Sequence, residues 1–217
     1  MKVIIFNGSP RIRKHSNTDK IIASFAEGLV KAGATYELYT LSDRAQWDAA
    51  RAAFLANDNL LIALPLYVEC VPGMLLEFLE TIPAVRERPA QLSFILQSGF
   101  EEGCQLRCGE AFLTTLPRQL GCTFGGVLAR GGNFSIRVTK GSAQRRVLKP
   151  YAGMGTAFVR HGNFLTEEAR KFTGPERCPA PLRFMITLMV KLVGHRIYER
   201  IAKEWGCVRP LNDRPYA

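Results

Sequence analysis

The sequence predicts an α/β fold, a doubly wound sheet of five parallel strands in the order 2-1-3-4-5, followed by a helical C-terminal extension. Short apolar runs alternate with segments of helical periodicity through residues 1–130. The run at 59–64 is apolar after its first residue, which is typical of a strand buried on both faces. Polar or glycine-rich loops follow several runs. Together these observations predict a parallel sheet with its ligand site at the carboxyl edge.

Each expected element has its own local signal. The strands are short apolar runs, and the helices between them carry apolar residues three and four positions apart. The expected strands are 3–6, 36–41, 59–64, 92–97 and 123–129. The expected helices are 19–31, 44–56, 75–82 and 104–120. These elements make up a first domain, residues 1–130, and leave 131–217 as the extension.

The loop at 7–18 joins the first strand to the first helix and has the chemistry of a phosphate site. Backbone N–H groups lack partners where a helix begins, and they bind phosphate well. The side chains that would add to them are Ser9, Arg11, Ser16, Asn17 and Thr18. The alternative is a capped turn, since Ser, Thr and Asn are also good N-caps.

Other phosphate-binding patterns do not fit. The loop lacks Gly-Lys-Ser/Thr after four variable residues, and it has one glycine where a dinucleotide fingerprint needs three. Neither Cys104 nor Cys108 is followed by arginine at the spacing of a Cys-x5-Arg phosphatase loop. What remains is a hydroxyl-lined loop of the kind that holds the phosphate of flavin mononucleotide (FMN).

Two separated motifs resemble a known family, the flavodoxin-like NAD(P)H-dependent FMN reductases and quinone reductases. The first is Gly8-Ser9-Pro10-Arg11 with Ser16-Asn17-Thr18, and the second is the Pro-Leu-Tyr loop at 65–73. The resemblance covers about residues 1–130. It implies a flavodoxin-like fold, FMN as cofactor, NADPH or NADH as electron donor, and a homodimer.

The resemblance also implies roles for particular residues. The phosphate would contact the loop residues named above, one side of the flavin ring would contact Pro65, Leu66 and Tyr67, and the ribityl chain and pyrimidine edge would lie near Ser98, Gly99 and Phe100. Tyr67 and Phe100 are either stacking residues or core aromatics. Hydride delivery needs no protein acid or base, so no catalytic side chain is expected. The acceptor would be a small molecule such as a quinone, a nitro compound or an azo compound.

Two other functions stay open. A flavodoxin-type electron carrier would hold FMN but pass electrons to a protein partner. A flavin-free member would bind a nucleotide as a sensor. Carriers of this type are usually acidic, whereas this chain has a formal net charge of +10.

Positive charge is concentrated in the C-terminal part. Residues 1–129 contain 12 Lys and Arg against 13 Asp and Glu, whereas residues 130–217 contain 17 against 6. This indicates either a solvated basic face or an anionic partner, such as the phosphates of NADPH or a membrane surface. Nucleic acid is not expected, because no recognised binding motif accompanies the charge.

The extension is expected to contain a long helix that starts near Pro181 and ends near Trp205. Its apolar stripe would lie on the core or on a second subunit, with a lipid surface less favoured. The apolar run at 184–193 is too short to cross a bilayer. Before it, a short amphipathic piece at 144–151 is expected between flexible connectors at 131–134 and at Gly153-Met154-Gly155.

The cysteines and histidines give no metal site. The six cysteines form no C-x-x-C pair, and the three histidines lie far apart without carboxylates or thiols at ligand spacing. Scattered thiols suit a reducing compartment. Because Met1-Lys2 leads directly into a strand, no targeting segment is expected and the protein is predicted to be cytoplasmic.

Overall fold

The computed structural model describes residues 1–12, 15–83 and 88–214. The chain forms two compact units, Met1–Arg177 and Cys178–Ala217. Each unit is described by itself. Arg13 and Lys14 of the expected phosphate loop lie outside the described residues.

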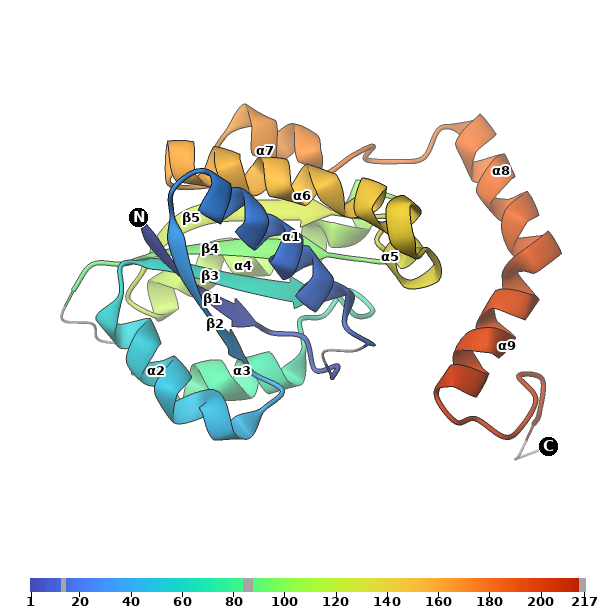
Figure 1. Cartoon of the computed structure of the whole chain (residues 1–217), viewed down its shortest axis with the longest axis horizontal. Coiled ribbons are helices and arrows are strands. Elements are labelled where there is room, and N and C mark those ends of the chain that lie inside the picture. The colour runs from blue at the N-terminus through green and yellow to red at the C-terminus, as the bar shows by residue number, and fades with distance from the viewer. Residues whose placement is uncertain (13–14, 84–87, 215–217) are drawn as a thin grey trace. The chain divides into compact units, whose positions relative to one another are not determined.

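The first unit contains the expected five-stranded parallel sheet, in the order β2-β1-β3-β4-β5 (Figure 1). The strands are β1 (Lys2–Asn7), β2 (Thr35–Thr40), β3 (Asn59–Pro65), β4 (Gln91–Gln97) and β5 (Thr123–Arg130). In the centre of the sheet, Phe6 pairs with Ile62, and Ile62 pairs with Phe94. These side chains are fully buried, which explains the unbroken apolar runs of the sequence.

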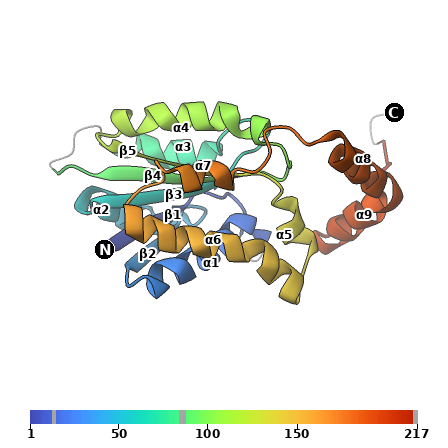
Figure 2. The ribbon, with the colours of Figure 1, turned by 90° about the horizontal axis from the view of Figure 1, so that it is seen from above.

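Helices cover both faces of this sheet, as Figure 2 shows. On one face lie α2 (Trp47–Ala56), α3 (Gly73–Glu80) and α4 (Arg107–Gln119), whose buried side chains share a core cluster with Phe6 and Phe94. On the other lie α1 (Asn17–Lys31), α6 (Gly141–His161) and α7 (Glu167–Phe172), around Ile5 and Ile95. Three shorter helical pieces complete this unit, η2 (Arg44–Gln46), η3 (Gly103–Leu106) and α5 (Phe134–Val138).

The sequence pattern predicts a flexible connector at Gly153-Met154-Gly155, and that prediction is wrong. These residues lie inside α6, an uninterrupted helix that packs along α1. A Cβ on Gly155 would lie 2.1 Å from the carbonyl oxygen of Phe25, and one on Gly28 would lie 1.9 Å from that of Ala152. The glycines therefore permit close contact between two helices. The burial gained there offsets the helix propensity that each glycine lacks.

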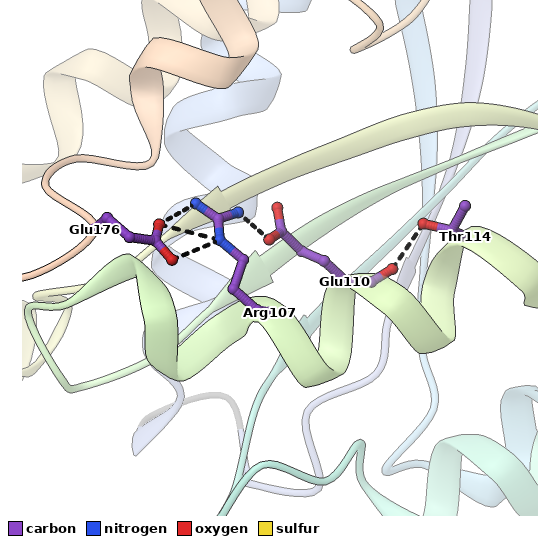
Figure 3. A network of polar contacts seen from close by, with 4 residues as sticks. All are labelled: Arg107, Glu110, Thr114 and Glu176. Carbon is purple, nitrogen blue, oxygen red and sulfur yellow. Dashed lines mark hydrogen bonds and ion pairs between the residues drawn. The ribbon is translucent and has the colours of Figure 1, made fainter.

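The first compact unit continues to Arg177. Its last residues are held against α4, as Figure 3 shows for Arg107 and Glu176. The guanidinium of Arg107 donates to both carboxylate oxygens of Glu176 at 2.5–3.1 Å and also pairs with Glu110. The backbone N–H of Gly103 donates to the carbonyl of Pro175 at 2.9 Å. Arg107 lowers the pKa of Glu176, and the carboxylate raises the pKa of Arg107.

The second unit is one long helical segment, as the sequence predicts. It comprises α8 (Ala180–Met189), the π-helical turn η4 (Val190–Gly194) and α9 (His195–Glu204), which follow one another without a break. Gly194 is the buried residue among these elements. Throughout the residues that the structure describes, no helix combines the length and the apolar character needed to cross a membrane.

Candidate functional site

Four loops meet at the carboxyl edge of the sheet, because β1, β3, β4 and β5 are parallel neighbours. Each of the first three is tied to the next strand by a backbone hydrogen bond. Gly8 N–H donates to Ala63 at 2.8 Å, Leu66 N–H to Gln97 at 2.8 Å, and Ser98 N–H to Arg130 at 3.1 Å. The edge that the sequence predicts as the ligand site is therefore formed by residues from loops far apart in the chain.

The loop after β1 is organised by side-chain to backbone hydrogen bonds. Asn7 Oδ1 accepts from Ser9 N–H at 3.1 Å, and Ser9 Oγ accepts from Arg11 N–H at 3.3 Å. Ser16 is the N-cap of α1, and its Oγ accepts from Asp19 N–H at 3.1 Å. Each of these hydroxyls keeps an O–H group to donate. Thus Ser16 caps the helix, as the simpler alternative proposed, and the N-terminus of α1 still faces the loop.

Two buried polar atoms here have no hydrogen-bond partner among the described residues, Asn7 Nδ2 and Asn17 Oδ1. Leaving such an atom unpaired costs about 1–3 kcal/mol, so it marks a place for a ligand. Asn7 Nδ2 is a donor and suits a phosphate oxygen. The side-chain nitrogen of Asn17 already donates to the carbonyl of Asn133 at 2.9 Å. The group that Asn17 can offer a phosphate is thus its backbone N–H at the helix start.

Arg11 and Thr18 connect this loop to its neighbours. Thr18 is buried, and its Oγ1 accepts from Gln97 Nε2, at the end of β4, at 3.2 Å. The guanidinium carbon of Arg11 lies 5.7 Å from the centroid of the Tyr67 ring, in the loop after β3. The structure therefore brings together the two motifs of the family resemblance.

The loop after β3 contains a strained turn. Tyr67 and Cys70 exchange backbone hydrogen bonds of 2.9 and 3.0 Å. Between them, Val68 and Glu69 have φ angles of 48° and 65°, in the left-handed region that favours glycine. Pro65 and Leu66 are buried, whereas Val68 is 92 % exposed. Strain of this kind is common at binding sites, and here the strained turn is exposed to solvent.

The loop after β4 exposes an aromatic ring at the same edge. Ser98 is buried, and its Oγ accepts from Phe100 N–H at 3.2 Å. The Phe100 side chain is 65 % exposed, so it is not a core aromatic. Gly132 N–H donates to the carbonyl of Phe100 at 2.6 Å. A Cβ on Gly131 would lie 2.3 Å from the same oxygen, so glycine is required where these loops touch.

Asn133 and Tyr151 organise the edge, and neither was predicted from the sequence to do so. Asn133 N–H donates to the carbonyl of Ser98 at 3.0 Å, and its Nδ2 donates to that of Arg130 at 2.8 Å. The hydroxyl of Tyr151, on α6, donates to Asn133 Oδ1 at 2.9 Å. Burial raises the pKa of Tyr151, which keeps this hydroxyl protonated. The available signal was a Gly-Gly-Asn sequence directly after a strand.

A basic groove of about 590 Å³ runs between α1 and α6. Its cations are Lys20, Arg145, Arg146 and Lys149, and its carboxylate is Glu27. Burial, together with the charge of Arg137, lowers the pKa of Lys20. A second pocket of about 300 Å³ is lined by the loop at 130–133 and by Glu101. Because Arg146 lines both, the groove and the edge pocket adjoin.

The sheet order and helix arrangement define a flavodoxin-like α/β protein, and solved structures share this fold. An NAD(P)H:quinone oxidoreductase from Methanothermobacter marburgensis is 17% identical with a TM-score of 0.54, covering 74% of this chain and 98% of that one. An NADH:FMN oxidoreductase in its apo form is 14% identical with a TM-score of 0.56, covering 83% and 98%. An azoreductase from Bacillus anthracis is 14% identical with a TM-score of 0.51, covering 72% and 99%.

A family model matches the amino-terminal part of the chain. Residues 1–95 match the family described as NADPH-dependent FMN reductase. These residues include both motifs on which the resemblance rests, so the resemblance is confirmed. No curated protein matches the chain.

Proposed function

We propose that this protein is an FMN-dependent oxidoreductase. When bound, FMN supplies the redox chemistry, taking a hydride from NAD(P)H and passing electrons to a small acceptor such as a quinone, a nitro compound or an azo compound. The family match of residues 1–95 supports this function. The structural observation that carries it is the unpaired, buried Asn7 Nδ2 beside the N-terminus of α1, since a phosphate would satisfy both.

The residues of the edge would position this cofactor. We assign the phosphate to Asn7 Nδ2, the hydroxyls of Ser9, Ser16 and Thr18, the guanidinium of Arg11, and the backbone N–H of Asn17. The assignment is supported by the chemistry of the donor set, because each group donates and the set carries positive charge. Pro65, Leu66 and Tyr67 would border one side of the ring.

Ser98, Gly99 and Phe100 would lie along the ribityl chain and the pyrimidine edge. An exposed Phe100 ring is free to stack on the flavin, and the bonds from Gly132 and Asn133 hold its loop in place. The unpaired Asn17 Oδ1 is an acceptor, which suits a ribityl hydroxyl.

We further assign the phosphates of the electron donor to the basic groove between α1 and α6. Its four cations face one carboxylate, and none of the four forms an ion pair with another described residue. Arg146 lines both this groove and the pocket at the edge loops, so the positive charge extends from one to the other. An elongated anionic dinucleotide matches this path.

A double substitution, Arg145→Ala with Lys149→Ala, tests the groove. Removing two exposed cations is expected to raise the KM for NADPH about tenfold, from about 0.7 kcal/mol each, while kcat stays within twofold. Steady-state kinetics measure this change. Arg160→Ala, at the exposed far end of α6, is the control and should leave the KM unchanged. An equal rise of the KM in the double variant and in Arg160→Ala would show that the groove does not bind the electron donor.

Purification with added FMN tests the function and separates the alternatives. A reductase retains FMN, shows flavin absorption, and is bleached by NADPH or NADH without another protein. A carrier retains FMN but is bleached only by a protein donor. A sensor takes up no FMN. Multiple turnovers with a quinone acceptor under steady-state conditions complete the test.

We also propose a homodimer in a reducing, cytoplasmic compartment. All six cysteines lie in the described residues and none of them forms a disulfide bond, which supports the compartment. Light scattering of the purified protein measures the oligomeric state, and a monomer at micromolar concentration would contradict the dimer. The location can be tested with a fluorescent fusion of the protein. A signal that survives protease treatment of intact cells would support the cytoplasmic location.

A further inference from the structure

The helical segment of the second unit exposes a continuous set of large apolar side chains. Phe184 is 71 % exposed and Leu192 is 69 % exposed. Met185, Leu188, Met189 and Trp205 are also exposed. Apart from Trp205, these side chains recur three and four residues apart along α8 and η4, so they lie on one side of the helical segment. An exposed apolar surface of this kind marks a binding surface.

The second unit cannot cover this surface by itself, because it consists of a single helical segment and a tail. Among the residues of α8, η4 and α9, Gly194 alone is buried. An isolated helix of this composition needs an apolar environment along its length. The surface that covers this helix must therefore be apolar, and its charge must suit the charges of the second unit.

Charge complementarity favours an anionic lipid surface. Residues 178–217 contain seven Lys and Arg against three Asp and Glu, a net charge of +4. Residues 1–177 contain 22 against 16, a net of +6. A second copy of this chain would therefore bring like charge to the helix, whereas anionic headgroups bring opposite charge.

The order of residues along the helix also fits a membrane surface. The apolar stretch at 182–193 contains only Arg183 and Lys191 as charged residues, whose long side chains can reach headgroups. It is too short to cross a bilayer. Next comes α9, in which Arg196, Arg200 and Lys203 outnumber Glu199 and Glu204, and then Trp205, a residue type enriched at membrane interfaces.

We propose that the helical segment 180–205 binds the surface of membranes that contain anionic lipids. The apolar side chains of α8 and η4 enter the boundary of the acyl chains. The basic side chains, mainly on α9, contact the headgroups. This proposal concerns a surface outside the cofactor site, so it stands whether or not the protein is a reductase.

Vesicle flotation with the full-length protein tests the proposal. The protein is expected to float with vesicles of 70 % phosphatidylcholine and 30 % phosphatidylglycerol, at about twentyfold higher partitioning than with phosphatidylcholine alone, and to lose binding as salt rises. Phe184→Asp with Leu192→Asp should reduce binding at least tenfold. Both positions are exposed, so the first unit should keep its thermal unfolding transition.

A matched pair of charge variants locates the site. Arg196→Glu with Arg200→Glu lowers the net charge of the chain from +10 to +6, as does Lys31→Glu with Arg160→Glu on the first unit. The first pair should lose binding about twentyfold, and the second should change it less than threefold. Equal loss in both pairs would assign binding to overall charge and overturn the proposal.

Two other results would also overturn it. One is no flotation with anionic vesicles. The other is a protein that forms a dimer and does not bind vesicles, and whose dimer becomes a monomer in the variant Phe184→Asp with Leu192→Asp. That result would assign the apolar surface to a second copy of the chain. Light scattering distinguishes these results on the same samples.

Discussion

Asn7 offers the sharpest test of the phosphate site at the scale of a single residue. Asn7→Asp keeps the oxygen that accepts from Ser9 N–H but replaces the unpaired Nδ2 donor with a second oxygen. We expect FMN affinity to fall about thirtyfold, corresponding to about 2 kcal/mol, because a lost donor and a like charge would face the phosphate. Titration followed by flavin fluorescence measures the affinity.

Riboflavin, which lacks the phosphate, is the control ligand for Asn7→Asp. Its affinity should change less than threefold if the substituted loop keeps its fold. A similar loss for riboflavin and FMN would show that the substitution acts on the fold, and the phosphate would then lie elsewhere.

Tyr151 tests the support of the edge loops. Tyr151→Phe leaves the buried Asn133 Oδ1 without its donor, which should lower the free energy of unfolding by about 1–3 kcal/mol. Urea denaturation followed by circular dichroism measures this change. Tyr36→Phe is the control, because Tyr36 is 40 % exposed, and it should change stability by less than about 0.5 kcal/mol.

Some residues of the candidate site could be predicted from the sequence, and others could not. Ser9, Ser16 and Thr18 are predicted at the phosphate from their types and spacing, because the sequence pattern of a phosphate loop is local. Asn133 and Tyr151 are missed, because their roles depend on hydrogen bonds to residues distant in the chain. The side-chain amide of Asn17 is predicted at the phosphate, whereas in the structure its nitrogen is already bonded to Asn133.

At the scale of elements, the contact between α1 and α6 depends on glycine. Gly155→Ala would place a Cβ 2.1 Å from the carbonyl oxygen of Phe25, so the helices must separate. We expect the free energy of unfolding to fall by about 1–3 kcal/mol, measured by urea denaturation. A stability equal to that of the unsubstituted protein would mean that the helices are not in close contact.

Gly153→Ala is the matched control for this prediction. Gly153 lies in the same helix, is exposed, and has no atom within 4 Å of an added Cβ. Because alanine favours the helix, this substitution should stabilise the protein by about 0.5–1 kcal/mol. The two Gly→Ala substitutions should therefore change the free energy of unfolding in opposite directions. This result would separate the effect of helix packing from the effect of helix propensity.

The strands and the first four helices were predictable for a local reason. Their apolar residues repeat at the spacing of the element that they form. For α6 the local signals point the other way, since it contains Pro150 and three glycines. Only the buried face against α1, around Tyr151 and Phe158, makes a continuous helix favourable, and that face is a tertiary property.

At the scale of the whole chain, stability should depend on pH through Arg107 and Glu176. The hydrogen bond from Arg107 lowers the pKa of Glu176. A lowered pKa in the folded state means that the pair stabilises above the ordinary carboxyl pKa of 4.5 and that this contribution is lost as pH falls through the folded value.

Glu176→Gln isolates this effect. The unsubstituted protein should be the more stable of the two at pH 7, and the difference should decrease toward zero below about pH 4. Urea denaturation at several pH values measures it. Since Glu176 is exposed, added salt should also reduce the difference. A difference independent of pH would contradict the ion pair.

By itself, the amino-acid sequence determined the alternation of strands and helices and the strand order, and its residues 1–95 match the family described as NADPH-dependent FMN reductase. These features depend on the periodicity of apolar residues and on short motifs, which are local. Tertiary structure alone decided the continuity of α6, the support of the edge by Asn133 and Tyr151, and the basic groove between α1 and α6. Each of these depends on packing or hydrogen bonds between residues distant in the chain, which only the folded arrangement brings into contact.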